Sequence, residues 1–304
     1  MEIAIACQDI EQVLSLKEGK TEKIANPIER DMYLHIRECL SSRLGHFSPA
    51  RLYFGSEFCQ YRIPKTTELA EAYAFARKRG YGFTFVTPYV PERGMKKLLP
   101  LLEWLQEEGD DVEVVVNDWG MLYMVASSFP SLRPVVGRLL NKMIRDPRVA
   151  YLYDRPEAPL PAKEAFFRSS FDVATFQTFF QRLNVKAIEY DSFLQPVYPP
   201  ALDVPISLHL GFAVIATGRA CLVGTLHQLK EHKFKGTVPC KQQCCHYIAE
   251  LVNKRTKLSE LPVRVFQKGN TSFYQQTPEL VEKGIDWAEE NGVWRLVVHF
   301  KIPV

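Results

Sequence analysis

Cysteine residues carry the clearest chemical signal in the sequence. Four of the seven cysteines lie in the stretch GRACLVGTLHQLKEHKFKGTVPCKQQCCH, residues 218–246: Cys221, Cys240, Cys244 and Cys245. A fifth, Cys59, ends the strand-like run RLYFGSEFC far upstream. Cys240 and Cys244 form a C-x-x-x-C pair, so one short turn can aim both sulfurs at one metal. Cys221 and Cys59 would complete a four-sulfur shell if the fold brings them together.

The spacing of the cysteines selects a set of ligands, but it does not select the metal that they bind. Thiolate is a soft ligand that suits zinc or an iron–sulfur cluster. Structural zinc sites usually take two local pairs of ligands, whereas two of these four cysteines are single and distant in sequence. Iron–sulfur ligation accepts such scattered cysteines. The spacing therefore leaves three alternatives open, namely an iron–sulfur cluster, zinc and unligated thiols.

The elements that must position these cysteines follow an alternating pattern. Short apolar runs alternate with helical patterns, of which the clearest are residues 66–80, residues 93–109 and a shorter helix that Asp118 would cap. Nearly continuous apolar strands that are each followed by a helix are typical of a parallel sheet. About six to eight such units favour an α/β fold of the TIM-barrel type, a parallel (β/α) barrel that is either regular or distorted.

The regular alternation fails in two places. Residues 150–170 carry Pro156, Pro159 and Pro161, and they predict a long connection. After Leu261, the runs LPVRVFQKGNTSFYQ and VWRLVVHFKIPV alternate like antiparallel or edge strands. We therefore expect a barrel-like domain with the metal site over residues 1–260, and a β-rich C-terminal segment over 261–304 that packs on it or helps to close it.

Polar side chains follow several of the predicted strands. Because the chemistry of a parallel barrel sits at the carboxyl ends of its strands, these residues are candidates for a site. They are Glu57, Cys59, Asp118, Asn141, Glu189, Asp191, His209, Arg219 and Cys221. Cys59 and Cys221 would share one rim of the barrel, which supports a common site.

Composition narrows the functional class. Hydrophobic residues make up 46% and charged residues 24%, as in globular proteins, and a net charge of +3 gives no strong field for nucleic acid. We find no signal peptide and no apolar run near the roughly 20 residues of a membrane span, so we expect a cytoplasmic protein. Neither H-E-x-x-H nor G-x-S-x-G is present, so no hydrolase motif stands out.

Three motifs together resemble the U-32 (collagenase-like) peptidase family. They are RLYFGSEFC, GRACL two-thirds along the chain, and C-x-x-x-C about twenty residues later. Gly211 stands ten residues before Cys221, as the glycine of the family's HG…SGRC segment does. The closer similarity is to the small ubiquinone-biosynthesis members, UbiU and UbiV, and it runs from about Arg51 to Cys245.

The resemblance implies a barrel-like fold and a 4Fe–4S cluster held by Cys59, Cys221, Cys240 and Cys244. Cys245 is the alternative to Cys244, because the alignment of the CC pair can slip by one. The resemblance also points to Glu189 and Asp118 as polar groups that face the substrate and act in acid–base catalysis. The other reading of these two residues is structural, a strand-end carboxylate bonded to backbone or arginine.

Three functions follow as hypotheses. The first is an oxygen-independent iron–sulfur hydroxylase, or its cluster-bearing subunit, that acts on a small lipid-like ubiquinone precursor or on an RNA base. The second is a collagenase-like peptidase. The third is non-catalytic, a chain that zinc or a cluster stabilises and that pairs with a homologous subunit as a heterodimer.

Overall fold

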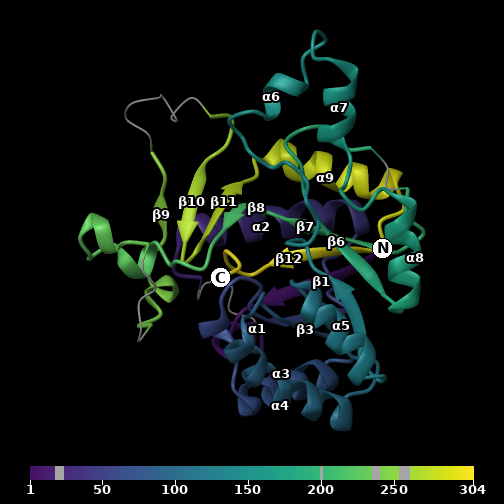
Figure 1. Ribbon diagram of the computed structural model, residues 1–304, viewed down its shortest axis with the longest axis vertical. Helices are drawn as coiled ribbons and strands as arrows, with labels where there is room; N and C mark the ends of the chain where they lie inside the picture. Colours follow the sequence, from purple (N-terminus) through teal and green to yellow (C-terminus); the bar gives the residue numbers. More distant parts are fainter. Residues whose placement is uncertain (18–23, 199–200, 235–239, 253–260) are drawn as a thin grey trace.

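The core of the protein is a closed barrel of eight parallel strands (Figure 1). The computed structural model describes residues 1–17, 24–198, 201–234, 240–252 and 261–304. Around the barrel the strands run in the order β1 (Glu2–Cys7), β12 (Arg295–His299), β7 (Ile206–Leu210), β6 (Ala187–Asp191), β5 (Arg133–Val136), β4 (Glu113–Val116), β3 (Gly82–Val86) and β2 (Arg51–Gly55). The predicted TIM-like barrel is confirmed.

Helices pack around the outside of the barrel, except that α6 and α7 project away from it (Figure 1). They are α1 (Ile10–Lys17), α2 (Pro27–Leu44), α3 (Thr66–Lys78), α4 (Glu92–Glu108), α5 (Trp119–Ser128), α6 (Ala150–Tyr153), α7 (Leu160–Phe167), α8 (Ala174–Arg182) and α9 (Pro278–Glu290). The apolar face of α4 buries Leu98, Leu102 and Leu105 against the strands, as its helical spacing predicted. Instead of a bare connection, residues 150–170 contain α6 and α7, the second of which starts with a proline near its N-terminus, where a missing N–H costs nothing.

The inside of the barrel is partly polar. This explains why the alternating residues of β12 were wrongly predicted to form an antiparallel or edge strand. Arg295, Val297 and His299 alternate along β12 and face inward, while Leu296 and Val298 face the helices. The guanidinium of Arg295, which is fully buried, donates to both oxygens of Glu113, at 2.7 and 3.0 Å. The alternation predicted an antiparallel or edge strand, but β12 pairs in parallel with both β1 and β7.

A second, four-stranded sheet lies beside the barrel (Figure 1). Its order is β8 (Phe212–Thr217), β11 (Thr271–Gln275), β10 (Val265–Lys268) and β9 (Ala249–Glu250), and its neighbours are antiparallel. The apolar run AVIAT, residues 213–217, has the composition of a barrel strand. It belongs instead to β8, because Gly211 turns the chain away from β7 with a φ of +97° that a larger residue rarely adopts.

The segment from residue 261 onward therefore contributes to both sheets. Its described residues form the β10–β11 hairpin of the second sheet, and then α9 and β12, which complete the barrel. Within the described ranges, no helix is long and apolar enough to cross a membrane.

Candidate metal centre

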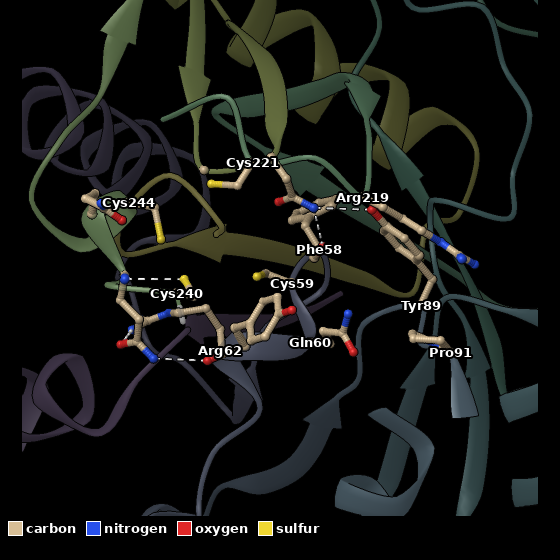
Figure 2. Close-up of a pocket in the computed structure, with 15 residues that line it drawn as sticks. Phe58, Cys59, Gln60, Arg62, Tyr89, Pro91, Arg219, Cys221, Cys240 and Cys244 are labelled. Carbon is tan, nitrogen blue, oxygen red and sulfur yellow. Dashed lines mark hydrogen bonds between the residues drawn. The ribbon is translucent and has the colours of Figure 1, made fainter. Parts of the chain in front are cut away.

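Four cysteines from three separate parts of the chain line one cavity. They are Cys59, Cys221, Cys240 and Cys244, and their sulfur atoms face the same space (Figure 2). The cavity encloses about 70 Å³, several times the roughly 15 Å³ that one water-sized group needs. These are the four residues expected from the sequence as one ligand set, and in the structure all four line this cavity.

Each cysteine is placed by an irregular segment at the edge of a regular element. Cys59 follows β2 and precedes a short 3₁₀ helix, Gln60–Arg62. Cys221 follows β8 and precedes another, Val223–Thr225. Cys240 and Cys244 flank a turn in which Gln242 adopts the left-handed conformation, with a φ of +52°. The two cysteines of the C-x-x-x-C pair thus reach the cavity from one tight turn.

Cys221 shares the cavity with Cys59 for a different reason from the one that the sequence suggested. The predicted shared rim of the barrel does not hold, because β8 is a strand of the second sheet. That sheet instead lies against the carboxyl end of β2, so that residues after β8 meet residues after β2.

Backbone N–H groups point at two of the sulfurs. The N–H of Gly224 donates to Cys221 Sγ at 3.2 Å, and the N–H of Gln242 donates to Cys240 Sγ at 3.3 Å. Burial raises the pKa of the Cys59 thiol to about 11, and the sulfurs of Cys240 and Cys221 nearby act in the same direction. Burial also raises the pKa of Cys221. A metal that binds here must therefore displace protons, and the N–H donors would then stabilise the thiolates.

Cys245 lies outside this cavity. Its side chain is exposed, and its sulfur accepts a hydrogen bond from Nη1 of Arg62 at 2.9 Å. Arg62 is itself held by Asp9 through Nη2 at 2.9 Å. Cys244 is buried and faces the other three sulfurs. Of the two candidates for the fourth position, the geometry favours Cys244.

The spacing of the sulfurs tests which group the cavity fits. A zinc ion bound by thiolates at about 2.3 Å in a tetrahedron holds its sulfurs about 3.8 Å apart. No three of the four sulfurs lie within 4.8 Å of one another, since across the described part of the chain only Glu57, His209 and His299 form such a group. In this structure the four sulfurs therefore do not have the spacing of a tetrahedral zinc site.

The Glu57, His209 and His299 group is the core of a buried network that sequence reasoning found only in part. Arg138 donates to both oxygens of Glu57, at 2.9 and 2.7 Å, and to Asp191 at 2.6 Å. Although burial alone would lower it, the pKa of Arg138 lies above its ordinary value because of these carboxylates. His209 Nδ1 and His299 Nε2 share a hydrogen bond at 2.8 Å.

This group is poorly suited to a cation. The guanidinium of Arg138 already carries a positive charge 3.4 Å from His299 Nε2 and occupies the Glu57 carboxylate. Burial lowers the pKa of His209 to about 3, and the positive charge of Arg138 acts in the same direction. His209 is therefore a neutral imidazole at neutral pH. Arg138 could have been suspected from the sequence, as the one charge in the apolar run PVVGRLL, residues 134–140.

The two carboxylates expected to act as acid and base lie in very different places. Asp118 is the N-cap of α5, where Oδ1 accepts from the N–H of Met121 at 2.7 Å and Oδ2 accepts from the N–H of Val90 at 3.1 Å. Glu189 points into the barrel, is fully buried, and has no hydrogen-bond partner among the described residues. Burial raises the pKa of Glu189 to about 8. Asp118 thus has the backbone-bonded arrangement of the structural alternative, whereas Glu189 does not.

Comparisons with known proteins do not assign an activity to this chain. No protein-family model matches the sequence, and no curated protein matches it. The structure is similar to the U32 peptidase Mk0906, with 13% identity, a TM-score of 0.37, and coverage of 98% of this chain and 92% of that one. It is also similar to a glycoside hydrolase family 18 N-acetylglucosaminidase from Paenibacillus barengoltzii, with 7% identity, a TM-score of 0.37, and coverage of 98% and 94%.

A third similar structure is the spore cortex-lytic enzyme SleL from Bacillus megaterium QM B1551, with 7% identity, a TM-score of 0.36, and coverage of 98% of this chain and 70% of that one. Likenesses at these identities and TM-scores do not bear on function. Function has to be inferred from the residues of the site.

Proposed function

We propose that this chain holds a 4Fe–4S cluster through Cys59, Cys221, Cys240 and Cys244 and acts as an oxygen-independent hydroxylase or as the cluster-bearing subunit of one. The observation that carries the proposal is that these four cysteines, from three distant segments, line one cavity. A cluster in this place would supply one-electron transfer. The chain's own residues contribute the thiolates and the amide donors from Gly224 and Gln242.

The spacing and surroundings of the sulfurs support a cluster over zinc. Among the described residues, no three of the cysteine sulfurs lie close enough together to bind one zinc ion. Hydrogen bonds to sulfur, such as those from Gly224 and Gln242, are a common way to tune an iron–sulfur centre. Phe58 also lines the cavity, and the guanidinium of Arg138 lies 5.5 Å from the centre of its ring. An apolar side chain thus separates the cavity from the buried polar network, which limits the access of water from that side.

The substrate class in this proposal comes from the motif resemblance to the U-32 peptidase family. It is a ubiquinone-type precursor or an RNA base, and a net charge of +3 favours the smaller, lipid-like molecule. Glu189 keeps a proposed role as a group that holds a proton at neutral pH, because its burial raises its pKa to about 8. We assign Asp118 no proton transfer, since both of its oxygens accept backbone N–H groups.

The test is metal content after purification without oxygen. We expect about four irons and four sulfides per chain with broad visible absorption, all lost in Cys59→Ser and Cys221→Ser. Cys245→Ser is the matched control, because it removes a thiol from the same turn but outside the cavity, and it should keep its iron. If Cys244→Ser kept the iron content of the wild type and Cys245→Ser lost its iron, then Cys245 and not Cys244 would be the fourth ligand.

Other results would point to the other two hypotheses. One zinc per chain without colour would contradict the cluster and leave a structural metal site. Cleavage of denatured collagen by the metal-free protein would favour a peptidase. Copurification with a homologous subunit would favour the third hypothesis, a non-catalytic chain that zinc or a cluster stabilises.

A further inference from the structure

The turn between β10 and β11 touches the segments that carry the cysteines. Its second residue, Asn270, is buried, and its side-chain Nδ2 donates to the carbonyl oxygens of Phe58 and Gly218, both at 2.7 Å. Phe58 immediately precedes Cys59, and Gly218 lies three residues before Cys221. A carboxamide has two N–H donors. The single amide group of Asn270 therefore joins the Cys59 segment to the Cys221 segment.

Backbone contacts from the same turn add to this link. The N–H of Gly218 donates to the carbonyl of Asn270 at 3.1 Å, and the N–H of Val223 donates to the carbonyl of Gly269 at 3.3 Å. These bonds fix the chain on both sides of Cys221. The position of Cys221 relative to the hairpin is thus set before any metal binds.

Gly269 brings the turn against a third cysteine. Its φ is +57°, and a Cβ placed there would lie 3.3 Å from Cys244 Cβ and 2.7 Å from a methyl carbon of Val304. Glycine therefore satisfies both the left-handed backbone and the close approach to Cys244. One two-residue turn contacts the segments of three of the four cysteines.

We propose that Asn270 is a positioning residue for the cysteine-lined cavity. Its amide holds the Cys59 and Cys221 segments at the separation that a bound cluster requires, so that binding does not have to order them. The inference rests on the proposed function, because it assigns the purpose of the link to metal binding. If Asn270 only stabilised the hairpin, its replacement would lower the free energy of unfolding. The rate of iron loss and the reduction potential of the folded protein would then stay unchanged.

The test compares two variants of Asn270 with a matched control. Asn270→Asp keeps the shape but replaces the donor with an oxygen, so that both carbonyls lose their partner. Asn270→Ala removes the donor without placing a charge there. Asn291→Asp is the control: Nδ2 of Asn291 donates to the carbonyl of Trp287 at 2.8 Å, at the end of α9 and outside the cavity lining.

Each protein is reconstituted with iron and sulfide without oxygen, and then three quantities are measured. They are the rate of iron loss to a chelator, the reduction potential of the bound cluster, and the far-ultraviolet circular dichroism. We expect both Asn270 variants to be folded, to lose iron about ten times faster than the wild type and to have a shifted potential, since residues that orient metal ligands typically contribute about 10- to 100-fold to affinity. Asn291→Asp should match the wild type in all three.

The outcomes separate this inference from the proposed function. Wild-type protein that takes up no iron would refute the proposed function and the inference with it. Wild-type protein that loads iron, with both Asn270 variants releasing it at the wild-type rate and potential, would refute the positioning role alone. Failure of both variants to fold would also refute it, because the residue would then be structural.

Discussion

Replacing Glu189 with glutamine should make the protein more stable at neutral pH. The carboxyl group is fully buried inside the barrel, and neither oxygen has a hydrogen-bond partner among the described residues. His209 Nε2 lies 3.2 Å from Oε2. Burial is the main cause of the raised pKa; the nearby charges act in both directions, Arg138 and Arg295 lowering it, and Asp191 and Glu113 raising it.

The size of the effect follows from the two pKa values. Burial raises the pKa from an ordinary value of 4.5 to about 8 in the folded protein. The folded state therefore binds a proton that the unfolded state releases, and the stability from this group is fully present below pH 4.5 and lost as the pH rises through about 8. The loss is about 1.4 kcal/mol per pH unit, or about 3 kcal/mol by pH 7. Glu189→Gln removes this dependence.

The assay is urea unfolding of the metal-free protein at several values between about pH 5 and pH 8, followed by both fluorescence and circular dichroism. The difference in unfolding free energy between Glu189→Gln and the wild type should grow in favour of the variant as the pH rises. Glu107→Gln, the same change at an exposed position on α4, is the control. A difference that stays constant with pH would mean that Glu189 is ionised in the folded barrel, and it would refute the reasoning.

Three further substitutions test the fold by the same urea assay. Arg138→Met should cost about 3–5 kcal/mol, because it leaves the carboxylate of Glu57 buried without its partner; a cost below about 1 kcal/mol would contradict the buried ion pair. Gly55→Ala should cost about 3 kcal/mol, since φ is +126° and a Cβ would lie 2.3 Å from the carbonyl oxygen of Val86. Asn26→Ala should cost about 1 kcal/mol, because Oδ1 of Asn26 caps α2 by accepting the N–H of Ile28 at 2.9 Å, and an unchanged stability would mean that the cap is not formed in solution.

Local signals in the sequence predicted much of the barrel. The helix over residues 93–109 was expected from the spacing of its leucines, and α4 spans Glu92–Glu108. Asp118 was expected to cap a helix, and it caps α5. Such elements depend on periodicity and on capping side chains, both of which lie within a short stretch of chain.

The sequence did not predict strand pairing correctly where a strand's partners are distant in the chain. The alternation of residues in β12 indicated one polar and one apolar face. It could not show that the polar face lies inside the barrel, where Arg295 donates hydrogen bonds to Glu113. In the same way, AVIAT has the composition of a barrel strand, and only the partner β11 makes it part of another sheet.

The cysteines could be selected as a set because their types and spacing are unusual, and the four expected ones line a single cavity. The network behind them could not be predicted as a unit. Arg138, Glu57 and His299 come from three strand ends, and the contacts among them exist only once the barrel closes.

The position of β12 between β1 and β7 has a consequence for how the protein is made. On the ribosome, Cys59 emerges early, but Cys221, Cys240 and Cys244 belong to the connection that leads from β7 to β12. Until that connection and the last strand leave the exit tunnel, β1 and β7 have unpaired edges and Cys59 faces no second thiol. We therefore expect a nascent chain from which β12 has not yet emerged to keep both of these edges unpaired and the barrel open, although all four cysteines precede that strand.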